Sequence, residues 1–279
     1  MKNFSFEFFP PNTEVGAQKL SQVHQDLAAL GPEFFSVTFG AGGATREKTL
    51  STVATLLATG SEVAPHVSCI GSTGETIRQL VDGYLALGVK RIVALRGDMP
   101  SGMGFGSAGE FRFASELVTF IRAHYGDRLH IEVAAYPEAH PQSKSAGADL
   151  NAFIAKVNAG ADSAITQYFF NADAYLHFRD QVHARGIGVP IVPGIMPITN
   201  YTQLARFSDA CGAEIPRWIK QRLVDFGDDT ESLKAFGHDV VLRLCEVLIR
   251  EGAPSLHFYT LNQTAPTSAL VQEIRPLIS

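Results

Sequence analysis

The stretch Phe4-Ser5-Phe6-Glu7-Phe8-Phe9-Pro10-Pro11 alternates phenylalanines with small or charged residues and then stops at two prolines. Alternate side chains of a β-strand lie on opposite faces, so the phenylalanines at even positions share one face and Ser5 and Glu7 the other. Burying an ionised carboxylate is costly unless it is paired, and the usual response is a raised pKa. We therefore interpret Glu7 as a candidate general acid with a raised pKa. A solvent-facing Glu on an edge strand is the alternative.

Working outward from this strand, short strand-like runs alternate with amphipathic helical patterns, which is typical of βα units around a parallel sheet. Eight strands are predicted, at 4–9, 34–40, 64–69, 91–97, 130–136, 163–170, 190–196 and 256–261. Helical segments such as 15–30, 47–58 and 76–87 separate them. The connection before the eighth strand contains 215–226 and 231–250, which predicts an extra helix before the last crossover.

Within these strands, one set of alternate positions is mostly large and apolar, as with Val93 and Leu95 in the fourth strand. The opposite set is small or polar and contains Ser5, Glu7, Ser36, Thr38, His66, Ser68, Arg96, Asp98, Glu132, Tyr136, Gln167, His257 and Tyr259. An open doubly wound sheet is apolar on both faces, whereas a closed barrel can carry polar groups inside. The pattern predicts an α/β fold, a (β/α)8 TIM barrel, as a single catalytic domain over residues 1–279.

The polar set concentrates toward the carboxyl ends of the strands, where barrel enzymes place their active sites. Any one of these residues taken alone is more simply interpreted as a satisfied interior group. Because six strands contribute polar groups to the same rim, we expect an active site there.

Composition excludes several classes of protein. The chain has 46% hydrophobic and 18% charged residues and a net charge of −5, without a basic cluster, so we expect no nucleic-acid partner. No uninterrupted apolar run approaches the ~18 residues of a membrane span. The three cysteines are widely spaced and form no CxxC pair, which favours a cytoplasmic protein without disulfides or zinc.

Glycine-rich segments follow two of the strands. The segment 104–109 satisfies the pattern GxGxxG, but it begins several residues after the fourth strand, so we interpret it as a loop and not as a Rossmann fingerprint. Gly42-Gly43-Ala44-Thr45 opens the helix after the second strand and is a weak candidate for an anion site at a helix N-terminus.

The segment after the fifth strand mixes aromatic, basic and acidic side chains. Tyr136-Pro137-Glu138-Ala139-His140 is followed by Lys144, Asp149 and Lys156, a combination that suits a nucleotide with its ring, ribose and pyrophosphate. A solvated helix start explains Asp149 and Lys156 equally well. None of the nine histidines lies in a metal-binding pattern such as HExxH, so no metal site is predicted.

Taken together, seven motifs closely resemble the 5,10-methylenetetrahydrofolate reductase family in its short bacterial form, in order and over nearly the whole chain. The motifs are 6–11 (FEFFPP), 36–41 (SVTFGA), 96–98 (RGD), 134–141 (AAYPEAHP), 165–170 (ITQYFF), 193–197 (PGIMP) and 257–262 (HFYTLN). The resemblance implies a flavoprotein oxidoreductase that uses FAD and NADH or NADPH to reduce methylenetetrahydrofolate to 5-methyltetrahydrofolate. It further implies ping-pong kinetics, a role in methionine synthesis and a homo-oligomer.

The resemblance also implies roles for individual residues. Glu7 matches the catalytic acid that protonates folate N10, and Asp98 matches a carboxylate beside the flavin that stabilises the cationic iminium ion. Positions matching FAD contacts are Thr38, Phe39, Ala41, His66, Arg96, Gly97, Asp98, Ala114, Tyr136, His140, Asp149 and Lys156. Positions matching substrate contacts are Asp98, Gln167, Gln203, Phe207, Tyr259 and Gln263.

Three positions depart from the pattern that the resemblance implies. Gln263 stands where close bacterial relatives carry an Arg that contacts the folate glutamate tail. Ala152 and Ala155 replace polar residues on the helix that lines FAD. From the residues themselves, a flavin-free barrel lyase or aldolase with Glu7 and Asp98 as an acid/base pair remains the alternative, and a binding barrel without chemistry is a third.

Overall fold

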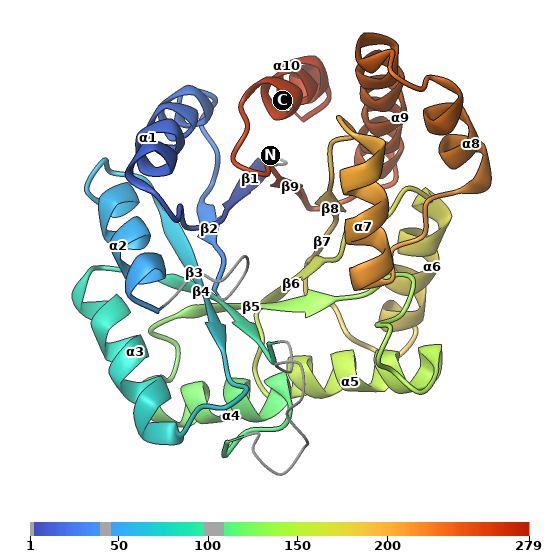
Figure 1. Cartoon of the computed structure of the whole chain (residues 1–279). Coiled ribbons are helices and arrows are strands. Elements are labelled where there is room, and N and C mark those ends of the chain that lie inside the picture. Colours follow the sequence, from blue (N-terminus) through green and yellow to red (C-terminus); the bar gives the residue numbers. More distant parts are fainter. Residues whose placement is uncertain (1–2, 40–45, 98–108, 279) are drawn as a thin grey trace.

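Parallel strands and helices alternate around a closed sheet in the computed structural model, which describes residues 3–39, 46–97 and 109–278 (Figure 1). The strands are β1 (Asn3–Phe8), β2 (Phe35–Val37), β3 (Val63–Ser68), β4 (Arg91–Leu95), β5 (His130–Ala135), β6 (Ser163–Thr166), β7 (Ile191–Val192), β8 (Gly194–Ile195) and β9 (Ser255–Tyr259). The helices are α1 (Glu14–Ala28), α2 (Arg46–Leu57), α3 (Gly74–Ala86), α4 (Ala114–Tyr125), α5 (Ala146–Asn158), α6 (Ala172–His183), α7 (Tyr201–Cys211), α8 (Arg217–Asp225), α9 (Thr230–Arg250) and α10 (Ala265–Ile278).

Pro193 divides the predicted seventh strand into β7 and β8, and the two halves close the sheet. The strand order is β7-β6-β5-β4-β3-β2-β1-β9-β8, so β7 pairs with β6 and β8 pairs with β9. Proline has no N–H to donate to a neighbouring strand. Its carbonyl still accepts a hydrogen bond from the His257 backbone at 3.0 Å, which keeps β9 attached across the break. The predicted (β/α)8 barrel is confirmed, with nine strand segments in place of eight strands.

The connection between β8 and β9 holds three helices. The sequence predicted 215–226 and 231–250, which correspond to α8 and α9, so the extra helix before the last crossover is confirmed. The preceding helix, α7, was not predicted. Its first turn is capped by Asn200, whose side chain accepts a hydrogen bond from the Gln203 backbone at 2.8 Å, and it ends at Gly212 in the left-handed region.

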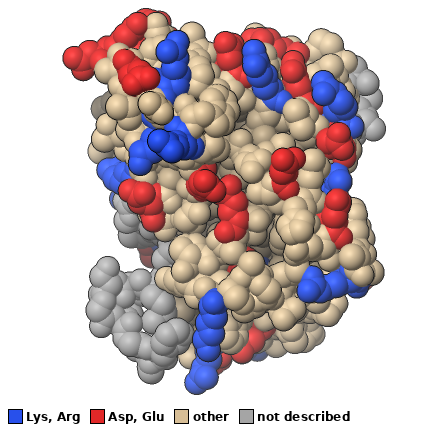
Figure 2. All heavy atoms as spheres, turned by 90° about the vertical axis from the view of Figure 1, so that its right-hand side faces the viewer, with Lys and Arg blue, Asp and Glu red and all other residues tan. Residues whose placement is uncertain are grey.

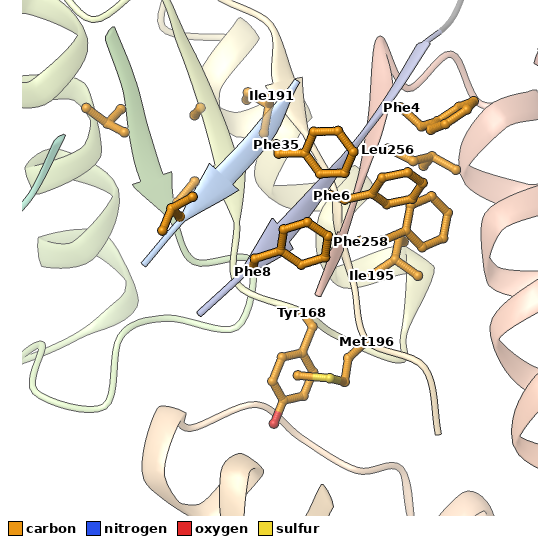
Figure 3. Packing of buried hydrophobic residues seen from close by; sticks show 14 of the residues in the cluster. Phe4, Phe6, Phe8, Phe35, Tyr168, Ile191, Ile195, Met196, Leu256 and Phe258 are labelled. Carbon is orange, nitrogen blue, oxygen red and sulfur yellow. The ribbon is translucent and has the colours of Figure 1, made fainter. Parts of the chain in front are cut away.

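The predicted faces of β1 are confirmed. Phe4, Phe6 and Phe8 project to one side of the strand (Figure 3), are at most 4% exposed and lie in the main core between the barrel and its helices. The rings of Phe8 and Phe35 stack at 5.1 Å. Full burial of such a side chain is worth about 1.5–3 kcal/mol, so this face fixes which way Glu7 points.

The barrel interior contains a smaller apolar cluster of Phe34, Ala64, Val93 and Ile165, with Leu95 and Val192 packed against it. The predicted faces of the fourth strand were therefore wrong. Val93 pairs with His66 and with Glu132 in register and points inward with them, whereas the neighbouring Ile92 and Ala94 belong to the outer core. Both faces of β4 are apolar because the middle of a narrow barrel must be filled by side chains.

Glu132 lies at the amino-terminal end of the barrel and not at the rim where the sequence pattern placed it. Its side chain is 1% exposed and accepts hydrogen bonds from Arg91 and from Ser163, both at 2.6 Å. Arg91 also pairs with Glu33. Burial would raise the pKa of Glu132, but hydrogen bonds from His130 and Ser163, then the charge of Arg91, lower it. This network closes the end of the barrel opposite the predicted active site.

The outer surface of the helices carries charges of both signs. On the face shown in Figure 2, acidic and basic side chains are interspersed. In the described part of the chain, no helix is long and apolar enough to cross a membrane.

We expect Arg91→Met to lower the free energy of unfolding by about 3–5 kcal/mol, because it leaves the buried Glu132 carboxylate without its cation. The matched control is Lys90→Met, which breaks the exposed pair with Glu62 and should cost about 0–1 kcal/mol. Denaturant unfolding measures both. Equal losses in the two variants would contradict the assignment.

The pH dependence of stability follows from the same group. Since the pKa of Glu132 is lowered in the folded state, its contribution to the free energy of unfolding is present above the unfolded pKa and is lost as the pH falls.

Candidate active site

Glu7 points into the carboxyl-terminal half of the barrel, where two histidines and a serine surround its carboxylate. Oε2 lies 3.4 Å from Nε2 of His66, 3.7 Å from Nε2 of His257 and 3.5 Å from Oγ of Ser36. The Glu7 side chain is 19% exposed, while the side chains of His66 and His257 are 10% and 0% exposed. The carboxylate is therefore mostly enclosed, with a small part of its surface in contact with solvent.

The expected raised pKa of Glu7 was wrong. Burial does act to raise the pKa, but hydrogen bonds from His257 and His66, with the charge of both rings, outweigh it and lower the pKa to about 2. The sequence motif around Glu7 contains no basic residue, so local reasoning considered only burial. In the folded barrel Glu7 is an ionised carboxylate held beside two imidazoles.

His257 connects Glu7 to a chain of polar groups inside the barrel. Its Nδ1 lies 2.7 Å from Oγ of Ser5, and its Nε2 lies 3.4 Å from Oγ of Ser36. The sequence pattern placed these three residues on the polar face of their strands but gave none of them a role in the site. Their shared alternate-position signal could not show that they meet, because His257 and Ser5 lie 252 residues apart.

Tyr259 is fixed two residues after His257 on the same face of β9. Its hydroxyl donates to the Thr166 carbonyl at 2.7 Å, and the rings of His257 and Tyr259 meet edge-on at 5.5 Å. A Cβ on Gly194 would lie 2.2 Å from the Thr166 oxygen and 2.6 Å from the Tyr259 ring. Tyr259 can therefore take this position only because residue 194 is a glycine, which has no Cβ.

A second group of predicted residues gathers around the half-buried Lys156 of α5. Lys156 donates to the Ala134 carbonyl. Burial lowers the pKa of Lys156 to about 8, the charge of Asp149 raises it and that of Arg96 lowers it further. Burial also raises the pKa of Asp149, against the charge of Lys156. Two cations and one carboxylate thus share a partly dehydrated region, which is an arrangement suited to an anionic ligand.

The loop after β5 joins this group. The rings of Tyr136 and His140 meet edge-on at 4.6 Å, and the Arg96 guanidinium donates to Oε1 of Gln142 in the same loop. Gly97, which follows Arg96, has φ +87, and a Cβ there would lie 1.9 Å from Oγ of Ser68. Only glycine lets the chain turn here against β3.

Thr38 carries a polar atom that lacks a partner within the described residues. Its side-chain oxygen is buried and makes no hydrogen bond there, although such groups are normally satisfied. Phe39 follows it and is half-buried. Ala114, another predicted contact, is the first residue of α4 and is also half-buried.

Three of the predicted substrate residues, Gln167, Gln203 and Phe207, line two small pockets beside α7. One is lined by Tyr136, Pro137, Glu138, Ala139, Gln167, Tyr168, Cys211, Gly212 and Ala213. The other is lined by Met196, Pro197, Thr199, Asn200, Gln203, Leu204, Phe207 and Leu261. Gln203 and Phe207 are one turn apart on α7 and so face the same pocket. Gln263 is half-buried in the turn that follows β9.

Two predicted site residues, Asp98 and Ala41, lie outside the described residues, as do positions 42–45 and almost all of 104–109. Within the described ranges, no group of three or more His, Cys, Asp or Glu side chains is arranged to hold a metal ion.

Comparison with solved structures supports the barrel. A Clostridium thermocellum protein that binds two copies of 5-methyl-5,6,7,8-tetrahydrofolic acid superposes with a TM-score of 0.70 and 18% identity, over 99% of this chain and 95% of that one. Dihydropteroate synthase from Thermus thermophilus gives a TM-score of 0.52 at 12% identity, over 98% and 93% of the two chains. At these identities the likeness establishes the fold alone.

Comparison of sequences goes further. The 5,10-methylenetetrahydrofolate reductase of Escherichia coli K12 is 42% identical over 269 residues, 96% of this chain and 89% of that protein. The Pectobacterium carotovorum enzyme of the same name is 41% identical over 96% and 88%. Methylenetetrahydrofolate reductase (NADH) 1 of Arabidopsis thaliana is 38% identical over 93% of this chain and 46% of its own.

The model of one protein family, described as methylenetetrahydrofolate reductase, matches residues 1–275. With barrel, motifs and near-complete alignment in agreement, the chain belongs to the methylenetetrahydrofolate reductase family.

Proposed function

We propose that this protein reduces 5,10-methylenetetrahydrofolate to 5-methyltetrahydrofolate, with FAD as cofactor and NADH or NADPH as reductant in a ping-pong cycle. Family membership supports the folate reaction. The observation that carries the proposal is the Glu7 carboxylate, placed in the barrel mouth between His66 and His257. A proton can be held there, in the carboxyl-terminal half of the barrel.

The residues present fit FAD. The half-buried Lys156 with Arg96 would face the pyrophosphate, Asp149 a ribose hydroxyl, and Tyr136 with His140 a ring. The Thr38 hydroxyl, which has no partner among the described residues, would gain an acceptor or donor. The proposed set is completed by Phe39, Ala41, His66, Gly97, Asp98 and Ala114. When bound, FAD supplies a hydride acceptor for the nicotinamide and a hydride donor for the folate carbon.

Glu7 is the proposed route of the proton to folate N10. A carboxyl with a pKa of about 2 does not itself hold a proton at neutral pH. Imidazole is the side chain that exchanges protons in that range, so we propose that the adjoining histidines supply the proton that Glu7 delivers. Asp98 is proposed to stabilise the cationic iminium form of the folate.

The remaining proposed contacts orient the folate. Gln203 and Phe207 line one pocket beside α7, and Gln167 lines the other. The Tyr259 hydroxyl donates to the Thr166 carbonyl, and this hydrogen bond holds the Tyr259 ring beside His257. Gln263 is proposed to meet the folate tail. We further propose a cytoplasmic homo-oligomer: all three cysteines are free, and α8 exposes Trp218 and Val224.

The purified protein should be yellow and should bleach when NADH or NADPH is added without oxygen, because reduction removes the visible absorption of the flavin. Anaerobic absorption spectra before and after addition measure this. Colourless protein that takes up no FAD would refute the cofactor proposal and would favour a flavin-free reaction.

Glu7→Gln should leave flavin reduction by the nicotinamide nearly intact and slow folate reduction by roughly 100- to 10,000-fold, the usual contribution of a general acid. Only the second half-reaction requires a proton on nitrogen. Stopped-flow measurement of the two half-reactions tests this. Glu33→Gln, at the opposite end of the barrel, is the matched control and should change neither rate. Equal loss of both half-reactions in Glu7→Gln would mean that Glu7 has a structural role.

His257→Gln should raise the pKa of Glu7 above about 2, because it removes a hydrogen bond and a charge that oppose burial. Infrared titration of the protonated carboxyl band, assigned by its loss in Glu7→Gln, measures this. The control is His24→Gln, a buried histidine on the outer side of the barrel that packs against Phe8 and Phe35. An unchanged Glu7 titration in His257→Gln would contradict the pairing.

A further inference from the structure

On the side of β9, the end of β1 is held by side chains and not by the strand ladder, whereas on the side of β2 the ladder continues to Phe8 and Val37. The pairing of β1 with β9 ends at Glu7 and Tyr259. Phe9, which follows the strand, is 38% exposed, and Pro10 has no N–H with which to continue the ladder. On the β9 side, the backbone of Glu7 and Phe9 therefore needs partners other than a strand.

Asn262 supplies these partners. Its Oδ1 accepts a hydrogen bond from the Phe9 N–H at 3.1 Å, and its Nδ2 donates to the Phe9 carbonyl at 2.8 Å. Thr260, two residues earlier, donates from Oγ1 to the Glu7 carbonyl at 2.7 Å and accepts from the Asn262 N–H at 3.1 Å. Together the two side chains hold the backbone of residues 7–9 as another strand would.

The turn that presents Asn262 has a rare conformation. Leu261 and Asn262 have φ values of 53° and 54°, two consecutive non-glycine residues in the left-handed region. Such residues persist only where the surrounding structure holds them in place, and they concentrate at functional sites. Asn tolerates this region, as glycine does, but only Asn brings an amide that can bond to Phe9.

The carboxylate of Glu7 depends on its backbone for its direction. Its contacts with His66, Ser36 and His257 are long, between 3.4 and 3.7 Å. Short hydrogen bonds would fix the side chain by themselves, whereas these contacts are weak in geometry. A small shift of the strand end therefore moves the carboxylate relative to both histidines.

We propose that Asn262 is a positioning residue for the reaction: its side-chain amide clamps Phe9 and, with Thr260, aims the Glu7 carboxylate at the site of proton transfer. This inference rests on the proposed folate reduction. It assigns to the turn after β9 a part in the second half-reaction, although Asn262 itself touches neither Glu7 nor its histidines by any hydrogen bond found in the described residues.

Asn262→Gly tests the amide alone, because glycine keeps the left-handed conformation. We expect normal FAD content and an unchanged rate of flavin reduction by the nicotinamide. The rate of folate reduction should fall by about tenfold or more, because a misplacement of a reacting group by about 1 Å can lower a rate on the order of 100-fold. Thr260→Val, a nearly isosteric change, should give the same split and serves if Asn262→Gly folds poorly. Thr264→Ala is the matched control: it breaks a bond from the same turn to Asp26 of α1 and should change neither rate.

A double-mutant cycle separates positioning from general support of the barrel. If Asn262 acts through Glu7, Asn262→Gly in the Glu7→Gln background should cause no further loss of folate reduction. Losses that multiply in the double variant, or wild-type rates of folate reduction in both Asn262→Gly and Thr260→Val, would overturn the inference while leaving the proposed function intact.

Infrared titration of Glu7 tests the same point without substrate. Asn262→Gly should shift the Glu7 titration because the carboxylate moves relative to His66 and His257, whereas Thr264→Ala should not. If wild-type protein fails to reduce folate, the proposed function fails, and this titration still decides whether Asn262 positions Glu7. An unshifted titration in Asn262→Gly would refute the clamp.

Discussion

The balance between burial and pairing at Glu7 is the constraint on which this barrel depends. A carboxylate inside a ring of strands loses most of its hydration, and that loss has to be offset by partners from other strands. His66 of β3 and His257 of β9 provide them, on either side of β1. The requirement for these partners links the register of three strands to the protonation state of one side chain.

The two ends of the barrel differ in how a buried carboxylate is paired. At the amino-terminal end, Glu132 accepts short hydrogen bonds from Arg91 and Ser163, and its side chain is almost inaccessible to solvent. A layer that includes Phe34, Val93 and Ile165 separates this end from the mouth. At the mouth, contacts to Glu7 are longer and its side chain is partly exposed. The short, complete hydrogen bonds of the amino-terminal end are suited to stability.

The sequence predicted the barrel because the alternation in β1 and the repeated βα pattern are local signals. The prediction from the sequence misplaced the faces of β4. Val93 and Ile92 are both apolar, so the alternation of residue types does not show which of them points into the barrel. The prediction also missed α7, whose capping by Asn200 is a short-range signal that was not used. The raised pKa predicted for Glu7 failed for a different reason: the groups that lower it come from β3 and β9, and no local pattern specifies which distant histidines meet a carboxylate.

The pairing of β1 with β9 has a consequence for how the protein matures. Ser5 and His257 are 252 residues apart in the chain yet share a hydrogen bond, so the seam between the first and last strands can form only after almost all of the polypeptide has left the ribosome. Closing so long a loop carries an entropic penalty, and contacts of this range slow folding. A nascent chain therefore exposes the edge of β1 throughout translation, and the cluster of Glu7 with His257 assembles in the final step.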